Sequence, residues 1–216
     1  MNVSERNTLS VFEILGIDLR KIPESQGKTP DFEGDVNGTR LLVEVKEIRE
    51  NPNERAELRK IENNDFVSKE EDLDGKRFQK VFSDANRQLK EYSDGNDFCI
   101  VVIQDVRHFF VRSESPLNEL HQAMFGAYVT WVNVDNKSVH FDCHEKSRAL
   151  NATKNTTISC AVMVFGGKYC PTVSAICIHN KFAKTRLPEG IFAQAGFKEY
   201  RSELVGQRET LVPINT

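Results

Sequence analysis

The chain has 216 residues, enough for one domain with its own hydrophobic core. Its composition, 39% hydrophobic and 28% charged, is that of an ordinary soluble globular protein. The net charge of −3 argues against a protein that coats nucleic acid through bulk electrostatics, but it permits an enzyme with one basic groove. No apolar run approaches the roughly 20 residues of a membrane helix, and the N-terminus lacks a signal-peptide core, so we expect a cytoplasmic protein.

The first half of the chain alternates between helical and extended patterns. Residues 8–21 place apolar side chains at helical spacing and predict a helix. Residues 30–48 form two alternating runs around Asn37-Gly38, a pair typical of a β-hairpin turn, because a type I′ turn needs positive φ at both central positions. Residues 49–77 are too polar for the core and predict a short exposed helix with a loop. Residues 77–93 predict an amphipathic helix.

The second half predicts mostly strands. Residues 98–104 are almost continuously apolar, as in a strand buried on both faces. Residues 116–126 begin with proline and end with glycine, which favours another helix. Further strands are expected at 127–134, 158–165 and 173–179.

This order predicts the α/β class, with a mixed sheet flanked by helices. We expect a single domain over residues 1–216. Its core would span about 8–135, and additional C-terminal strands would form a β-rich extension over about 136–216.

A two-residue turn at Asn37-Gly38 would set the register of the whole hairpin. The numbers of each cross-strand pair then sum to 75, so Asp31 lies directly opposite Glu44. Lys46 lies two residues further along the strand, on the same face. The other face would be apolar and formed by Phe32, Val36, Leu41, Val43 and Val45.

The two facing carboxylates predict a metal site. Like charges placed opposite one another destabilise a sheet, whereas a bound divalent cation turns their repulsion into attraction. Oxygen ligands suit Mg²⁺, with Mn²⁺ as an alternative. A lysine beside the cation can stabilise a pentavalent phosphate or orient the attacking water. Asp31, Glu44 and Lys46 therefore predict phosphodiester hydrolysis; the alternative is a solvated strand face with a salt bridge.

Pro30-Asp31, twelve intervening residues and Glu44-Val45-Lys46 resemble the signature of the PD-(D/E)XK nuclease superfamily, which has the restriction-endonuclease-like fold. The common core of that superfamily is a helix, a three-stranded antiparallel meander, a helix and a further strand, and residues 8–105 resemble it. The resemblance implies that Asp31, Glu44 and the Val45 backbone carbonyl bind Mg²⁺, and that Lys46 positions or activates the water.

Two further elements extend the resemblance. Some members carry a glutamate on the first helix, and Glu13 is the candidate because it lies beside Phe12 and Gly16 on the expected inner side. Several members carry Gln-x-x-x-Tyr on the helix after the site, which Gln88 and Tyr92 match on one helical face. Glu13 would add a metal or water contact, and Gln88 would position the substrate.

The sequence therefore predicts a Mg²⁺-dependent nuclease, an endonuclease or related hydrolase that binds nucleic acid, most favourably DNA. Restriction, defence and repair are settings that follow from the resemblance alone. Basic residues on the 77–93 helix are the expected phosphate contacts, and cutting both strands of a duplex favours a homodimer. The alternative is a nuclease-fold subunit that binds or scaffolds without chemistry.

The five cysteines form no C-x-x-C pair. At least Cys99, Cys160 and Cys177 lie in apolar runs, where a reduced cysteine packs as a small hydrophobe. The segment 140–144 contains two histidines and a cysteine but lacks the paired spacing of a zinc site. We therefore expect no structural disulfide, and no zinc site at 140–144.

Overall fold

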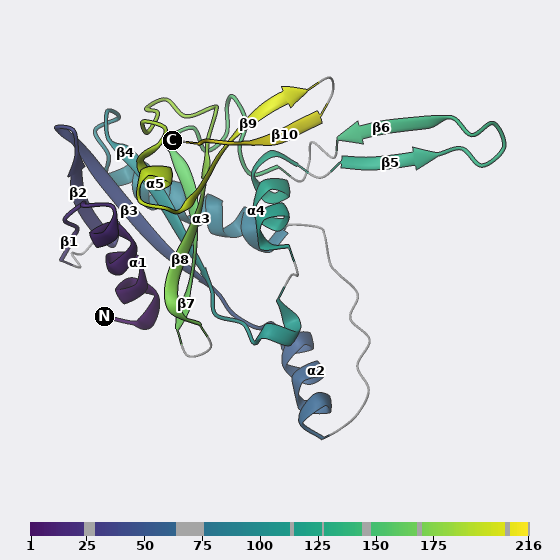
Figure 1. Cartoon of the computed structure of the whole chain (residues 1–216), viewed down its shortest axis with the longest axis horizontal. Coiled ribbons are helices and arrows are strands. Elements are labelled where there is room, and N and C mark those ends of the chain that lie inside the picture. The colour runs from purple at the N-terminus through teal and green to yellow at the C-terminus, as the bar shows by residue number, and fades with distance from the viewer. Residues whose placement is uncertain are drawn as a thin grey trace.

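The computed structural model describes residues 1–23, 29–63, 76–112, 115–126, 128–143, 148–167, 170–205 and 208–215. An eight-stranded mixed sheet with helices on both faces dominates the molecule, which confirms the α/β class (Figure 1). In spatial order its strands are β1 (Arg20–Lys21), β2 (Phe32–Val36), β3 (Thr39–Ile48), β4 (Phe98–Asp105), β7 (Cys160–Gly167), β8 (Cys170–His179), β9 (Lys198–Val205) and β10 (Arg208–Pro213).

The centre of the sheet is parallel and its ends are mostly antiparallel. Strands β3, β4 and β7 run in the same direction, as do β8 and β9, and all other neighbours are antiparallel. Because β7 pairs directly with β4, the residues expected as a C-terminal extension continue the sheet of the core.

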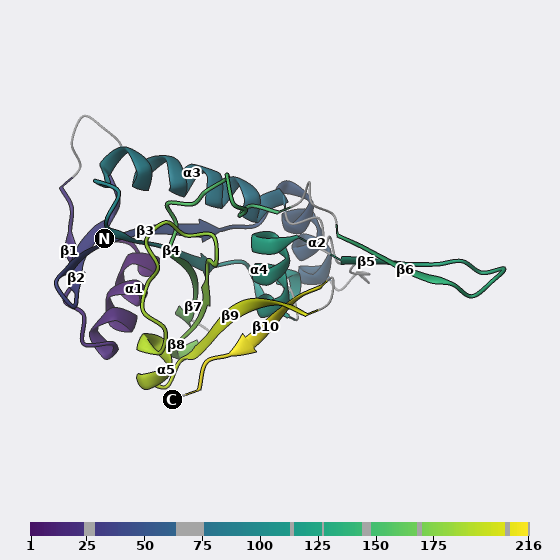
Figure 2. The same cartoon turned by 90° about the horizontal axis from the view of Figure 1, so that it is seen from above.

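The helices cover the sheet from opposite sides (Figure 2). On one side lie α1 (Val3–Ile14) and the short α5 (Ile191–Gln194), and on the other α3 (Lys76–Tyr92) and α4 (Pro116–Phe125). No helix in the described ranges is long and apolar enough to cross a membrane.

Two smaller elements lie outside these layers. Helix α2 (Pro52–Glu62) follows β3 and is the short exposed helix that the sequence predicted, and it contacts the 3₁₀ turn η1 (Phe109–Val111). Strands β5 (Tyr128–Val132) and β6 (Val139–Cys143) form a separate two-stranded sheet that projects from the body in both views (Figures 1 and 2).

The first helix begins and ends earlier than the predicted 8–21. It begins at Val3 because Asn2 and Glu5 form a capping box, in which each backbone N–H donates to the other side chain at 2.8 Å. It ends at Ile14, shortly before Gly16 adopts a positive φ of 73°. The expected boundaries were wrong because the apolar pattern begins nearly two turns after the cap.

The hairpin has the predicted register. Asn37 and Gly38 have φ values of 56° and 82°, as a type I′ turn requires, and Val36 pairs with Thr39. The apolar face is also as predicted and packs against α1 through Phe32, Val36, Leu41, Val43 and Val45. The opposite face of β3 lies under α3.

Candidate metal centre

Asp31 directly precedes β2 and Glu44 lies on β3, at the open end of the hairpin. Phe32 pairs with Val43, so the next position in the register sets Asp31 opposite Glu44. The backbone N–H of Val45 donates to Asp31 Oδ2 at 2.7 Å, which fixes the aspartate against β3.

Both carboxyl groups hold protons more readily than usual. Glu44 is only 2% exposed. Burial raises the pKa of Glu44 to about 7, and the negative charge of Asp31 adds to the effect while Lys46 opposes it. Burial also raises the pKa of Asp31, although the hydrogen bond from Val45 acts in the opposite direction. The site therefore concentrates negative charge that the protein alone only partly compensates.

Lys46 connects the hairpin to α3. Its Nζ donates to Glu44 Oε1 and, at 2.8 Å, to Gln88 Oε1. Gln88 in turn makes a long contact of 3.5 Å from Nε2 to the Thr29 carbonyl, in the segment just before Asp31. The structure thus brings together Asp31, Glu44, Lys46 and Gln88, four of the five predicted catalytic residues.

One oxygen of this cluster makes no hydrogen bond in the described part of the chain. Glu44 Oε2 is fully buried and has no donor at hydrogen-bonding geometry, although the Asp31 backbone N–H is close enough to the carboxyl group to lower the pKa of Glu44. Leaving a buried acceptor unsatisfied costs about 1–3 kcal/mol, and more for a charged group. A divalent cation bound by Glu44 and Asp31 would satisfy this oxygen and offset the repulsion, so the residues present fit Mg²⁺. The expected contribution of the Val45 carbonyl stays a prediction.

Glu13 does not join the cluster. It lies on the exposed side of α1, whereas its neighbour Phe12 packs in the core, so the expected inner position was wrong. Among the described residues, no hydrogen bond or ion pair links Glu13 to Asp31 or Glu44.

Glu5 is the carboxylate that α1 directs toward the hairpin. It is 8% exposed, and Lys21 Nζ donates to its Oε1 at 2.8 Å. Burial raises the pKa of Glu5, but hydrogen bonds from Lys21 and from the Asn2 backbone outweigh burial and hold that pKa below its ordinary value. Its charge also raises the pKa of Asp31. The capping box was the sequence signal that could have identified Glu5, since it sets where the helix begins.

Tyr92 takes a different place from Gln88. The two residues face the same strand, but Tyr92 lies beneath the Arg40 guanidinium, whose carbon is 5.7 Å from the ring centroid. Arg40 also pairs with Asp97 at 2.8 Å. Tyr92 therefore helps to fasten α3 to the far end of β3 rather than lining the metal site.

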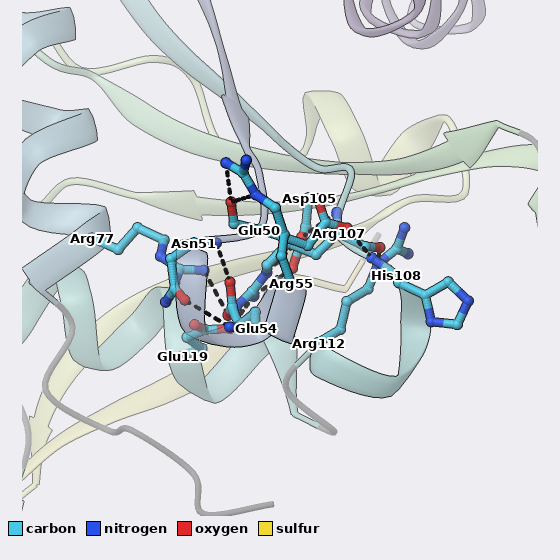
Figure 3. A network of polar contacts seen from close by, with 10 residues as sticks. All are labelled: Glu50, Asn51, Glu54, Arg55, Arg77, Asp105, Arg107, His108, Arg112 and Glu119. Carbon is cyan, nitrogen blue, oxygen red and sulfur yellow. Dashed lines mark hydrogen bonds and ion pairs between the residues drawn. The ribbon is translucent and has the colours of Figure 1, made fainter. Parts of the chain in front are cut away.

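A buried ionic network lies beyond the C-terminal end of β3 (Figure 3). Arg107 is 5% exposed and donates to Asp105 Oδ2 at 2.6 Å and to Glu54 Oε1 at 3.2 Å. Its Nη2 also lies 3.5 Å from Glu119 Oε2 on α4. Arg77, at the start of α3, pairs with the same Glu54 at 3.0 Å. The network therefore ties α2, α3 and α4 to the end of β4, next to the strand that carries Glu44 and Lys46.

No family model, no curated protein and no solved structure matches this chain. The geometry of the described residues therefore carries the functional conclusion.

Proposed function

We propose that the protein is a Mg²⁺-dependent nuclease of the PD-(D/E)XK type, which hydrolyses phosphodiester bonds and acts most favourably on DNA. One observation carries the proposal. Among the described residues, buried Glu44 lies beside Asp31, pairs with Lys46 through one oxygen and makes no hydrogen bond through the other. A salt bridge that serves stability alone would need only Lys46 as the partner of Glu44. A buried carboxylate oxygen without a hydrogen bond, lying beside a second carboxylate, suits a divalent cation.

The order of elements supports a restriction-endonuclease-like core. The chain runs from α1 through the antiparallel strands β1, β2 and β3, and after α2 continues with α3 and then β4, which is parallel to β3. This order resembles the helix, meander, helix and strand of the superfamily. Strands β7 to β10 then extend that sheet.

In the proposed mechanism, Asp31, Glu44 and the Val45 carbonyl would hold Mg²⁺ or Mn²⁺. Bound there, the cation would supply Lewis acidity to the phosphodiester. Lys46 Nζ lies at the carboxylate and is oriented by Gln88, so it is placed to hold the attacking water or a phosphate oxygen. Glu5 replaces Glu13 as the acidic residue of the first helix.

The exposed edge of α3 supports nucleic acid as the substrate. Lys80, Arg87 and Lys90 are exposed on this helix, and Arg87 directly precedes Gln88. Contacts of this kind fix the register of a duplex through its phosphates. We propose that a homodimer cuts duplex DNA, because each chain offers one such site.

A second candidate follows from the Lys46–Glu44 ion pair. Lys46 already neutralises Glu44 without a metal, which also suits a nuclease-fold subunit that binds or scaffolds nucleic acid without cutting it.

The test is cleavage of single- and double-stranded DNA and RNA by the purified chain with Mg²⁺, Mn²⁺ or EDTA. The variants are Asp31→Asn and Lys46→Met, with Glu13→Gln as the matched control on α1. We expect metal-dependent cleavage that both site variants lose and the control keeps. Equal residual cleavage in all samples would identify a contaminant. Nucleic-acid binding without cleavage of any substrate would support the scaffolding candidate instead.

A further inference from the structure

A second group of metal-ligating side chains lies away from the hairpin. Cys177 and His179 are two residues apart on β8, so their side chains share one face of the sheet. Glu199 on β9 is the direct parallel partner of Cys177. Strands β4 and β7 separate β8 from β3, so this group is independent of Asp31 and Glu44.

The three side chains converge within the protein. One ligand atom from each lies within 4.8 Å of the other two, and all three residues are buried. The set contains a sulfur, an imidazole nitrogen and a carboxylate oxygen. Zinc accepts all three kinds of ligand, whereas Mg²⁺ and Ca²⁺ prefer oxygen. The geometry and the ligand chemistry both point to a transition metal.

The carboxylate of Glu199 is held in a fixed orientation. The backbone N–H of Gly190 donates to its Oε1 at 2.9 Å, and that of Ala193 donates to its Oε2 at 2.8 Å. Backbone donors of this kind orient a metal ligand from the second shell of residues. Each carboxylate oxygen can accept more than one bond, so the two backbone contacts leave room for a metal.

The bond between His179 and Glu199 defines the competing explanation. His179 Nε2 lies 2.6 Å from Glu199 Oε1, and this contact alone would fasten α5 and β9 to β8. Tetrahedral zinc places nitrogen and oxygen ligands about 3.4 Å apart, as follows from bond lengths of about 2.1 Å. The contact would therefore have to open by somewhat under 1 Å, which a shift of the imidazole can provide.

Charge balance favours zinc in this buried position. One thiolate and one carboxylate carry two negative charges, which neutralise Zn²⁺ when the imidazole is neutral. On binding, the sulfur–zinc bond replaces the S–H bond and the proton passes to solvent.

We propose that Cys177, His179 and Glu199 bind one Zn²⁺ ion that stabilises the C-terminal half of the sheet. His179 also lines a cavity of about 170 Å³ together with Ser159 and Asn180. The ion would join β8 to β9 and, through the backbone bonds to Glu199, to α5.

The experiment is a titration of the full chain, stripped with EDTA and dialysed, with Co²⁺ as a spectroscopic substitute for Zn²⁺. We expect a sulfur-to-cobalt charge-transfer band that saturates at one equivalent and disappears when Zn²⁺ is added. Cys177→Ser should abolish the band, and Glu199→Gln should weaken binding at least tenfold. Cys99→Ser is the matched control, because Cys99 is equally buried but packs on the opposite face. Asp31→Asn should also keep the band.

Two results would overturn the proposal: a wild-type chain without a stoichiometric band, or a Cys177→Ser chain that retains it. If Cys177→Ser fails to fold, thermal melting decides instead. Zn²⁺ should raise the Tm of the wild type, of Cys99→Ser and of Asp31→Asn. A wild-type Tm that one equivalent of Zn²⁺ leaves unchanged would identify the His179–Glu199 contact as purely structural.

Discussion

The backbone N–H of Val45 donates a 2.7 Å hydrogen bond to Asp31 Oδ2, so the strand that carries Glu44 also holds the carboxylate opposite it. The backbone of the hairpin thus sets the position of Asp31, and side-chain packing is secondary. Because an asparagine oxygen can accept the same hydrogen bond, the charge of Asp31 can be removed without removing this contact.

Asp31→Asn should separate stability from activity. The substitution keeps the bond from Val45 and removes the repulsion of Glu44, so the metal-free Tm should stay unchanged or rise slightly. Cleavage should fall by at least about 100-fold, the scale on which loss of one electrostatic catalytic contact is measured. Melting curves with and without Mg²⁺ give the second readout, since the rise in Tm produced by Mg²⁺ in the wild type should vanish. A variant that keeps this rise would remove Asp31 from the metal site.

Glu44 should make the metal-free protein less stable as pH increases. Its pKa is about 7 in the folded chain against an ordinary value of 4.5, so the folded state binds more protons between these values. The contribution to the free energy of unfolding is fully present below pH 4.5 and is lost as pH rises through 7, with an upper bound of about 3 kcal/mol. Urea unfolding at pH 5 and pH 8 measures it. Glu44→Gln should flatten the pH dependence of the free energy of unfolding, and Mg²⁺ should restore the stability of the wild type at pH 8. An equal pH dependence in the wild type and the variant would contradict the role given to Glu44.

Lys46→Met should abolish cleavage while retaining Mg²⁺ binding. The variant removes the positive charge from Glu44 Oε1 but leaves both carboxylates in place. Without metal it should lose about 1 kcal/mol of stability at pH 8 and less at pH 6, where Glu44 is protonated. Calorimetric titration with Mg²⁺ measures the retained binding, and the cleavage assay measures the lost activity. Lys198→Met, exposed on β9 and separated from β3 by β4, β7 and β8, is the control and should behave as the wild type in both assays.

Arg107→Met should destabilise the fold without altering the metal site. Arg107 is buried among three carboxylates, and removing one partner of a buried ionic network costs about 3–5 kcal/mol. Arg87→Met is the control, because the Arg87 side chain is 54% exposed and pairs with Asp84 on the surface. Its loss should change the free energy of unfolding by no more than about 0.5 kcal/mol. Urea midpoints compare the two. Similar midpoints would mean that the network contributes little.

The sequence predicted the hairpin well because its determinants are local. Asn37 and Gly38 tolerate the positive φ of the turn, and alternation along β2 and β3 then fixes which side chains share a face. The buried strand β4 and the amphipathic helix α3 were also predictable from local patterns, since a continuous apolar run marks the strand and a single helical period marks the helix.

The remaining features depend on contacts between distant segments. The pairing of β7 with β4 joins residues about 60 positions apart, and nothing in either strand specifies its neighbour. Glu5 was missed because the start of α1 was placed after its cap. Cys177, His179 and Glu199 were missed because only the parallel pairing of β8 with β9 brings the glutamate beside the cysteine.

The two-residue turn also makes the site sensitive to the length of the chain. In a sheet, shifting a strand by one residue exchanges its two faces. A single residue inserted at Asn37-Gly38 and absorbed by a shift of β3 would turn Glu44 and Lys46 toward α1 and bring Val43 and Val45 under α3. Substitutions can tune this site gradually, but one insertion or deletion at the turn would dismantle it while leaving most of the protein intact.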